Sequence, residues 1–231
     1  MKIQFPFSHK KELVITIHGF GKKTALEMAP LKSFLEKNGF EVWTFAYYDP
    51  GRLDDVDFHQ WIARCEEKVR QAIAAKRTIH LLGFSMGGVI ASYLASVFDV
   101  KDLLLAAPAF YPLNFAKIEQ AARNKVLSSG DSSSSMSSEQ TKAFLNVVSS
   151  YRHSIDHVDC PILILHGTAD EVIPTKSTEK IFAQLSTKKK ALIWIEGARH
   201  RFLYDGSYES LAFPIIRDYF KGEIHPQVYP S

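Results

Sequence analysis

The sequence predicts a doubly wound α/β fold, in which helices cover both faces of a mostly parallel sheet. Short apolar runs without polar alternation recur along the chain, and most are followed by a turn and a helical pattern. Strands without alternation are buried on both faces, and strands separated by helices pair in parallel through right-handed crossovers. Because 231 residues fit one hydrophobic core, we expect residues 1–231 to form a single domain.

The strand and helix candidates alternate along the chain. The strands are expected at residues 13–17, 41–46, 78–82, 103–107, 162–165 and 191–195. The helices are expected at about residues 30–39, 57–73, 86–98, 179–185 and 208–220. Pro30 suits the first turn of the first helix, and Asp57 can cap the second. The inward stripe of the second helix is predicted to be Trp61, Ile62, Cys65, Val69, Ala72 and Ile73.

One segment interrupts the alternation of strands and helices. From Phe110 to about Asp159 no strand is predicted, and residues 128–138 are almost all serine. Helical patterns at 115–127 and 138–150 flank this serine-rich tip. We therefore expect a helical insertion at about 109–159. Insertions of this length without strands are often functional, so a lid over the site is favoured over a loop that only decorates the sheet edge.

Composition and charge exclude several classes of protein. Hydrophobic residues make up 46% of the chain and charged residues 23%, which excludes disorder of the whole chain. The net charge of +3 is mild and the lysines are scattered in short groups, which is typical of solvated turns, so no nucleic-acid partner is expected. Oligomeric state is left open by these numbers.

The apolar segments do not indicate a membrane protein. Residues 79–98 are nearly uncharged, but one histidine, three glycines and three serines in that run make a spanning helix costly. The apolar run at 13–17 is too short for a secretory signal and has no cleavage site after it. We therefore expect a cytoplasmic protein without a membrane span.

The most informative segment is Gly83-Phe84-Ser85-Met86-Gly87, which matches the pattern G-x-S-x-G. A predicted strand ends just before it and a predicted helix begins just after it, which is the context that this nucleophile motif requires. Glycines are needed because the serine sits on a very tight strand-to-helix turn. The helix N-terminus also favours negative charge beside Ser85, as develops during acyl transfer.

Ser85 needs a base within hydrogen-bond reach, and late loops supply the candidates. Asp170 follows the strand at 162–165, and His200 follows the strand at 191–195, so both lie past carboxyl ends of strands, where open parallel sheets place their sites. Asp170 could instead be a turn or cap residue, and His200 a surface histidine. Order along the chain favours the catalytic reading, with His200 as base and Asp170 orienting it.

The remaining histidines and the cysteines fit other roles. His80 lies inside a strand and is expected to be a satisfied core residue, while His166 is a weak rival for the base. Cys65 and Cys160 are too few for a disulfide framework and are expected to pack as small apolar residues. No zinc-binding spacing occurs, so neither a metal nor a cofactor is expected.

The segment His18-Gly19-Phe20-Gly21 follows the first strand, and its glycines let a backbone N–H turn toward a reacting carbonyl oxygen. His18 is expected to brace this loop. A phosphate-binding loop is the alternative, because Gly21 precedes a lysine. That motif requires glycine where Thr16 stands and serine or threonine where Lys23 stands, so a nucleotide-binding site is excluded.

Four motifs follow one another along the chain, namely His18-Gly19-Phe20-Gly21, Gly83-Phe84-Ser85-Met86-Gly87-Gly88, Gly167-Thr168-Ala169-Asp170 and Gly197-Ala198-Arg199-His200. Together they resemble the α/β-hydrolase superfamily, nearest to small carboxylesterases and monoacylglycerol-lipase-like enzymes, over nearly the whole chain. The resemblance implies a triad of Ser85, Asp170 and His200, an oxyanion hole formed by the N–H groups of Phe20 and Met86, and a lid in the insertion. One departure is that the insertion is short and serine-rich, so lid contacts of family members cannot be transferred. Candidate pocket walls, which could equally be core residues, are Phe20, Met86, Phe110, Tyr111, Val172 and Phe202.

The predicted function is hydrolysis of small to medium carboxylic esters through an acyl-enzyme. A serine at the elbow argues against haloalkane dehalogenases and epoxide hydrolases, which use aspartate there. Thioesterases and acyltransferases keep the same triad and stay as alternatives, as does a catalytically silent ligand-binding protein on this fold.

Overall fold

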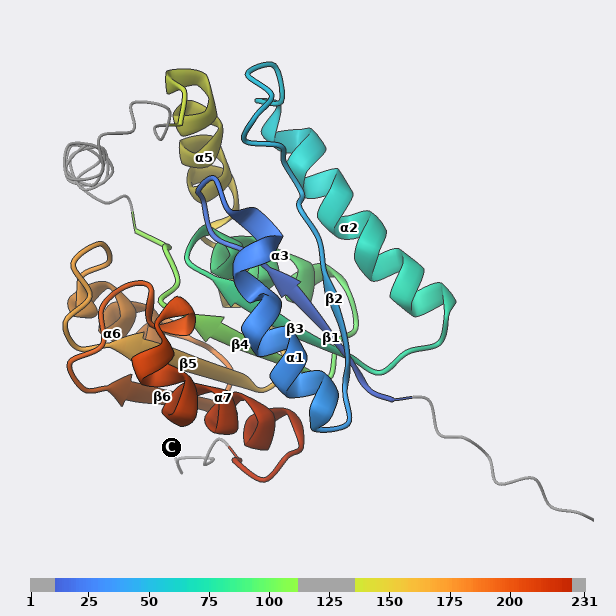
Figure 1. The fold of residues 1–231 in the computed structure, drawn as a ribbon, viewed down its shortest axis with the longest axis vertical. Helices are drawn as coiled ribbons and strands as arrows, with labels where there is room; N and C mark the ends of the chain where they lie inside the picture. Colours follow the sequence, from blue (N-terminus) through green and yellow to red (C-terminus); the bar gives the residue numbers. More distant parts are fainter. Residues whose placement is uncertain (1–10, 112–135, 226–231) are drawn as a thin grey trace, which may run out of the picture.

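The computed structural model describes residues 11–111 and 136–225, which form a six-stranded sheet flanked by helices (Figure 1). The strands are β1 (Leu13–Ile17), β2 (Glu41–Thr44), β3 (Ile79–Phe84), β4 (Asp102–Ala106), β5 (Ile162–Gly167) and β6 (Lys190–Ile195). Their order is β2-β1-β3-β4-β5-β6, and every neighbouring pair is parallel. The parallel α/β sheet predicted from the sequence is confirmed, and all its carboxyl ends face one edge.

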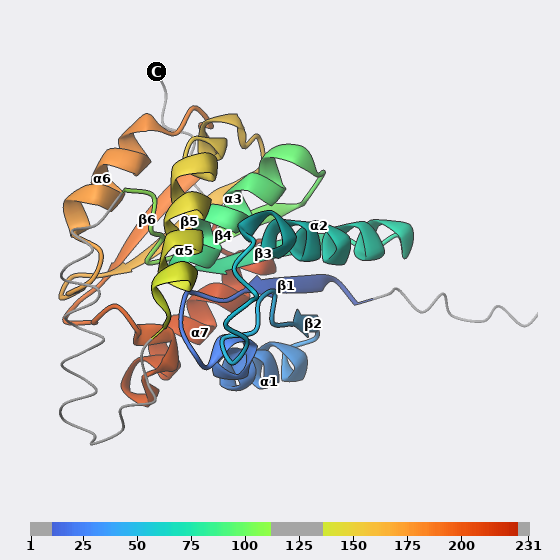
Figure 2. The ribbon, with the colours of Figure 1, turned by 90° about the horizontal axis from the view of Figure 1, so that it is seen from above.

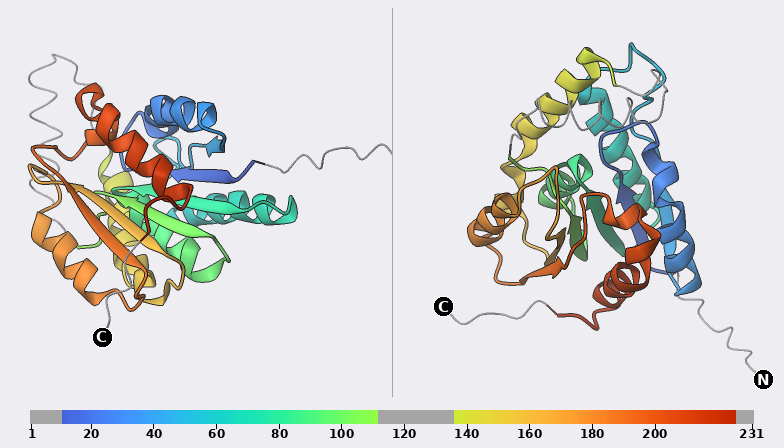
Figure 3. Two further views of the ribbon diagram at one scale, coloured as in Figure 1. Left: turned by 90° about the horizontal axis from the view of Figure 1, so that it is seen from below. Right: turned by 60° about the vertical axis from the view of Figure 1, so that its left-hand side comes forward.

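Helices cover both faces of the sheet. They are α1 (Ala29–Lys37), α2 (Phe58–Ala74), α3 (Met86–Val97), α5 (Ser138–Tyr151), α6 (Thr175–Gln184) and α7 (Gly206–Phe220), with the 3-10 helices η1 (Thr24–Met28), η3 (Ser154–His157) and η4 (Phe202–Tyr204). In Figures 2 and 3, α1 and α7 lie on one side of the sheet and α2, α3, α5 and α6 on the other. The architecture is therefore a three-layer sandwich.

Each face of the sheet has its own hydrophobic core. Alternate residues of β1 illustrate the division, since Leu13 and Ile15 pack with α2 and α3 whereas Val14 packs with α1 and α7. All five residues of β1 are buried, as expected for a strand covered on both sides. Burial on both faces explains why the strand sequences lack polar alternation.

Several boundaries and one core assignment differ from the sequence prediction. Ile73, expected on the inward stripe of α2, is 45% exposed, whereas the neighbouring Ala72 is buried as predicted. The helix α6 begins at Thr175, four residues before the predicted start. Its first turn is polar and carries no apolar periodicity. Asp57 caps α2 as predicted, accepting a hydrogen bond from the His59 N–H.

Part of the predicted insertion lies outside the described residues. The helix expected at 115–127 and most of the serine-rich tip fall in 112–135. The second predicted helix is present as α5, which starts with a capping box between Ser137 and Gln140. The Gln140 amide also donates to the carbonyls of Pro50 and Arg52, which joins α5 to the loop after β2. Among the described residues, no helix is long and apolar enough to cross a membrane.

Candidate active site

Ser85 sits on a strained turn between β3 and α3. Its backbone has φ 54° and ψ −119°, a region that non-glycine residues rarely adopt. The turn is held by hydrogen bonds from the Ser85 N–H to the Ala106 carbonyl (3.0 Å) and from the Gly88 and Ala109 N–H groups to the Ser85 carbonyl (2.9 and 3.1 Å). The end of β4, the segment that follows it and the start of α3 thus hold Ser85 in this conformation.

The glycines around Ser85 are required by contact distances. A Cβ atom on Gly83 would lie 2.3 Å from the Gly87 carbonyl oxygen, and one on Gly87 would lie 2.1 Å from that of Ile17. A Cβ atom on Gly88 would come within 2.9 Å of Pro108. The steric role expected for the elbow glycines is confirmed by these distances.

Ser85, His200 and Asp170 form a continuous hydrogen-bonded chain. The carboxylate of Asp170 can only accept, so His200 Nδ1–H donates to Asp170 Oδ2 (2.8 Å). His200 Nε2 is then the unprotonated nitrogen, and it accepts from the Ser85 hydroxyl (3.2 Å). Ser85 is 9% exposed, His200 7%, and the Asp170 side chain is fully buried. The tautomer that a serine nucleophile needs is therefore the one this geometry holds.

Asp170 is stabilised in its charged form despite its burial. Its Oδ1 accepts from the N–H groups of Val172 (2.9 Å) and Ile173 (2.7 Å), while Oδ2 also faces Nε2 of His166 at 3.1 Å. Burial by itself would raise the pKa of the Asp170 carboxyl, but hydrogen bonds from His166 and His200 hold that pKa well below its usual range. A permanently ionised Asp170 can stabilise an imidazolium at His200.

His166 lies on the far side of Asp170 from His200. Its Nε2 is 3.1 Å from the carbonyl oxygen of Ile173 and equally close to the carboxylate, so this nitrogen carries the proton. Its Nδ1 accepts from the hydroxyl of Thr178 (2.7 Å). His166 therefore orients the Asp170 carboxylate, and in the described structure it makes no hydrogen bond with Ser85.

The loop 196–201, which carries His200, is joined to the loop 167–173, which carries Asp170. The Gly197 N–H donates to the Thr168 hydroxyl (2.8 Å), and the Ala169 N–H donates to the Ala198 carbonyl (3.0 Å). The N–H of His200 itself donates to Glu171 Oε2 (3.2 Å). Backbone and side chain of the histidine are thus both held by consecutive acidic residues.

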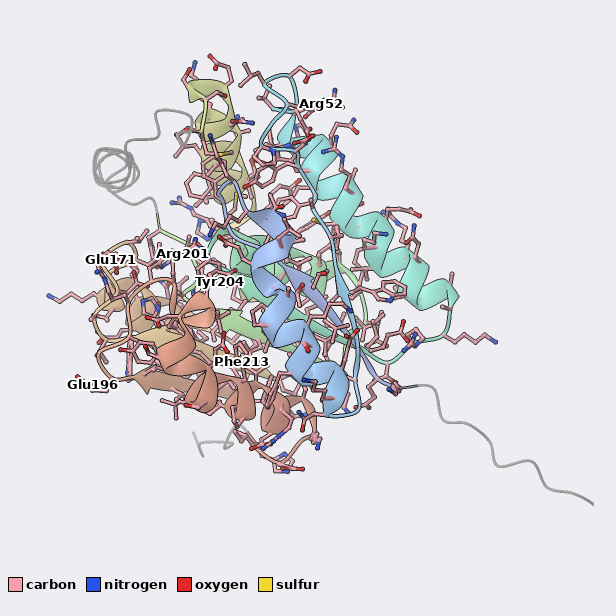
Figure 4. All side chains as sticks on the ribbon, viewed as in Figure 1. Arg52, Glu171, Glu196, Arg201, Tyr204 and Phe213 are labelled. Carbon is pink, nitrogen blue, oxygen red and sulfur yellow. The ribbon has the colours of Figure 1, made fainter. Side chains whose placement is uncertain are left out.

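Arg201, the neighbour of His200, links this region to the segment after β1. Its guanidinium pairs with the carboxylate of Glu27 in η1 and lies 4.8 Å from the centre of the Tyr204 ring. Figure 4 shows the Arg201 and Tyr204 side chains close together. The ion pair fixes the spacing between the histidine loop and the segment that follows the His18-Gly21 loop.

The loop from His18 to Gly21 lies against the nucleophile turn. A Cβ atom on Gly19 would be 3.2 Å from the Ser85 Cβ, so the loop passes beside the serine immediately before Phe20. Met86 is the first residue of α3, where a backbone N–H has no intrahelical partner. Burial lowers the pKa of His18 to about 4, although the hydrogen bond with the Gly19 carbonyl opposes this change. His18 is therefore neutral near pH 7, as a bracing residue would be.

Comparisons with known proteins agree with this geometry. The family described as alpha/beta hydrolase fold matches residues 12–127, and the family described as serine aminopeptidase, S33, matches residues 118–207. The first match covers half of the chain, from β1 through the nucleophile turn. The chain belongs to the α/β-hydrolase family.

Relatives of this α/β hydrolase include lipases and esterases. It is 24% identical over 212 residues to a thermostable monoacylglycerol lipase of Bacillus sp. strain H-257 (81% of this chain, 82% of that protein). It is 21% identical over 220 residues to a carboxylesterase of Bacillus subtilis strain 168 (87% and 89%). The monoacylglycerol lipase of Paleococcus ferrophilus superposes with a TM-score of 0.72 at 16% identity (93% and 97%), which supports the fold.

The predicted pocket residues of this α/β hydrolase lie in several different places. Phe20 stacks on Phe144 of α5 at 5.0 Å between ring centres, so α5 stands beside the His18–Gly21 loop. Phe110 and Tyr111 follow β4 and line a small cavity with Arg152 of the α5 end and Ile181 of α6. Met86 starts α3 directly after Ser85, the partly exposed Val172 donates its N–H to Asp170, and Phe202 is buried in the core under α1 and α7.

Sequence reasoning missed several residues that support the candidate site. Glu171 and the pair Tyr47-Tyr48 are the main ones, and Tyr47 and Tyr48 contact the His18–Gly21 loop through their hydroxyls. A signal for the tyrosines was available, because they closely follow β2 and so lie at the carboxyl ends of the strands, where the site also lies. His80 is a satisfied core histidine as predicted, with Nδ1 2.8 Å from Asp102. Burial raises the pKa of Cys160 to about 12, in keeping with an unreactive thiol.

Proposed function

We propose that this protein is a carboxylic ester hydrolase in which Ser85 is the nucleophile, His200 the general base and Asp170 the orienting acid. The observation that carries the proposal is the chain of hydrogen bonds from Ser85 Oγ through His200 to the buried, ionised Asp170, with Ser85 on a strained turn. A lone serine is a poor nucleophile, and this chain supplies the base that activates it.

The proposed reaction proceeds in two steps. Ser85 Oγ attacks the ester carbonyl while its proton passes to His200 Nε2, and Asp170 stabilises the resulting imidazolium. The N–H groups of Phe20 and Met86 donate hydrogen bonds to the carbonyl oxygen and stabilise the negative charge that develops on it. His200 returns the proton to the departing alcohol. Water, deprotonated by the same histidine, then attacks the acyl-enzyme, and His200 passes that proton to Ser85 Oγ as the carboxylic acid leaves.

The relatives support an ester substrate, and we propose one of small to medium acyl chain. Two relatives that align over most of their length are named as a monoacylglycerol lipase and a carboxylesterase. In the described part of the insertion, Phe144 of α5 contacts Phe20 beside the serine, so α5 is proposed as one wall of the acyl pocket. The insertion at 109–159 is accordingly proposed to border the site within a single domain.

The test is hydrolysis of p-nitrophenyl esters from acetate to palmitate by wild type and Ser85→Ala. We expect Ser85→Ala to lower kcat roughly 10⁴- to 10⁶-fold and to abolish labelling by a fluorophosphonate. Ser92→Ala is the matched control, because Ser92 is a buried serine on α3, the helix that follows Ser85, and its hydroxyl bonds only the Gly88 carbonyl in the described structure. Its activity should equal that of wild type.

The outcomes separate the alternatives. Equal activity of wild type and Ser85→Ala would overturn the assignment of the nucleophile. Labelling of Ser85 without hydrolysis of any ester in the series would favour a thioesterase or an acyltransferase, and addition of a thioester or an acceptor alcohol then distinguishes these two. Absence of both labelling and hydrolysis would favour a silent ligand-binding protein.

A further inference from the structure

Two consecutive tyrosines after β2 hold the His18–Gly21 loop at its two ends. The Tyr47 hydroxyl donates to the His18 carbonyl (2.8 Å), and the Tyr48 hydroxyl donates to the Gly21 carbonyl (2.7 Å). The Tyr48 oxygen also accepts from the Gly21 N–H at 2.6 Å. Phe20, whose N–H is assigned to the oxyanion hole in the proposed function, lies between these two anchor points.

The tyrosines are themselves fixed by α2. The Tyr48 ring stacks on Trp61 with 4.6 Å between ring centres and 29° between planes. Arg64 donates to the Tyr47 carbonyl (2.9 Å) and is paired with the buried Asp55. Asp55 in turn accepts from Trp61 Nε1 at 3.3 Å. Because both rings are fully or almost fully buried, the hydroxyl positions are set by packing before any substrate arrives.

The loop has no regular backbone hydrogen-bonding pattern of its own. It belongs to no helix or strand, and Gly21 has an extended backbone with no atom near the place of a side chain. A hydroxyl that both donates to and accepts from Gly21 restrains the two peptide planes on either side of that residue. The first of these planes joins Phe20 to Gly21 and adjoins the Gly19–Phe20 plane, which carries the Phe20 N–H. A donor aimed at an oxyanion is effective only when its orientation is fixed in advance.

We propose that Tyr48 is a positioning residue of the oxyanion hole, whose hydroxyl holds Gly21 so that the Phe20 N–H points at the reacting carbonyl. This inference rests on the proposed function for the role of Phe20. Tyr48 takes no part in proton transfer. Burial raises the pKa of its phenol, although the hydrogen bond to the Gly21 carbonyl opposes this change, so the hydroxyl stays protonated in the neutral range.

The test compares Tyr48→Phe with Tyr219→Phe. Tyr219 is the matched control, because it is another buried tyrosine whose hydroxyl donates to a main-chain carbonyl, that of Leu103 at 3.2 Å, remote from the loop. Each variant loses one buried hydroxyl and keeps its ring. A purely structural role predicts similar losses of thermal stability and no difference in catalysis between the two variants.

Two measurements are made on each variant. We expect Tyr48→Phe to lower kcat about tenfold to 10²-fold for p-nitrophenyl butyrate with KM unchanged, because misplacing a transition-state donor affects chemistry and not ground-state binding. Hydrogen–deuterium exchange of the peptide covering residues 19–22 should become faster in the same variant. Tyr219→Phe should change neither quantity.

Each outcome decides a separate claim. Wild-type exchange and wild-type kcat in Tyr48→Phe would overturn the inference, as would an equal fall of kcat in Tyr219→Phe. Faster exchange with unchanged kcat would leave Tyr48 as a structural support and overturn its role in the oxyanion hole. If Ser85→Ala is as active as wild type, the proposed function fails on its own measurement and the oxyanion role falls with it, whereas exchange still reports whether Tyr48 holds the loop.

Discussion

His200 is held at more points than a hydrogen-bonded triad requires. Its ring donates to Asp170, its main-chain N–H donates to Glu171, and its ring packs 5.1 Å from that of Phe84 between centres. Consecutive acidic residues therefore restrain both the rotation of the imidazole and the position of the backbone that carries it. Fixing the proposed base in this way lowers the cost of reaching the reactive geometry.

At this scale we predict that Glu171 positions the base through its carboxylate oxygen. Replacing it in Glu171→Ala should lower kcat about three- to tenfold, since the bond to the His200 N–H is partly exposed and correspondingly weak. Glu171→Gln keeps an acceptor oxygen and should recover most of the activity. Steady-state kinetics on one p-nitrophenyl ester measures both effects.

Arg199→Ala is the control for Glu171. Arg199 Nε lies 3.3 Å from the same Glu171 oxygen, but the Arg199 side chain makes no described hydrogen bond with His200. Its removal should leave kcat near the wild-type value. Equal losses in Arg199→Ala and Glu171→Ala would mean that the ion pair matters and the hydrogen bond to His200 does not.

At the scale of elements, the site depends on how closely α3 approaches β1 and β3. The start of α3 lies against the end of β1, because Gly87 leaves room for the carbonyls of Ile17 and His18. A similar approach occurs at β5, where a Cβ atom on Gly167 would lie 2.1 Å from the Ala198 carbonyl. Close contacts between backbones therefore align the serine and histidine loops.

We predict opposite effects for two glycine substitutions. Gly87→Ala places a methyl group 2.1 Å from a backbone oxygen of a buried strand, so the free energy of unfolding should fall by more than about 3 kcal/mol. In Gly206→Ala, at the start of α7, the added Cβ atom has nothing within 4 Å. This substitution should raise the free energy of unfolding by about 0.4–1 kcal/mol, because alanine restricts the unfolded chain. Urea denaturation measures both values, and a stable Gly87→Ala protein would contradict the predicted contact.

At the scale of the whole molecule, acid stability has contributions from two buried groups in different pH windows. Asp170 has a lowered pKa, so its stabilisation is present above the unfolded value and is lost only as pH falls below about 4. His18, enclosed by Tyr47 and Tyr48, has its pKa lowered from 6.5 to about 4. The unfolded chain therefore takes up a proton at this residue before the native protein does.

We predict that His18 makes the protein less stable between pH 7 and pH 5. Protonation of the unfolded chain below its pKa of 6.5 should cost the native state about 2 kcal/mol at pH 5. His18→Gln removes the titrating group and keeps a side-chain amide. Its free energy of unfolding should therefore fall less than that of wild type between pH 7 and pH 5, by about 2 kcal/mol. Denaturant titrations of both proteins at the two pH values provide the measurement, and parallel losses would contradict the buried neutral state of His18.

Much of the fold followed from the sequence by local rules. Apolar runs of strand length, caps such as Asp57 and the glycine pattern around Ser85 act over a few residues, so they can be read without a structure. Ser85, Asp170 and His200 were singled out in the same way, because each follows a strand of a parallel sheet whose carboxyl ends share one edge. The predicted start of a helix was less accurate where its first turn was polar, as in α6, which begins at Thr175.

Tertiary structure alone decided which side chains hold the site in place. His166 and Thr178 behind Asp170, Glu171 on the His200 backbone, and Tyr48 on Gly21 all depend on the packing of segments that lie far apart in the chain or turn back on themselves. A hydrogen bond needs two atoms within about 3 Å with fixed directions, and residue spacing does not determine such distances across a fold. The sequence by itself determined the chemistry available at the sheet edge, and three-dimensional packing determined its orientation.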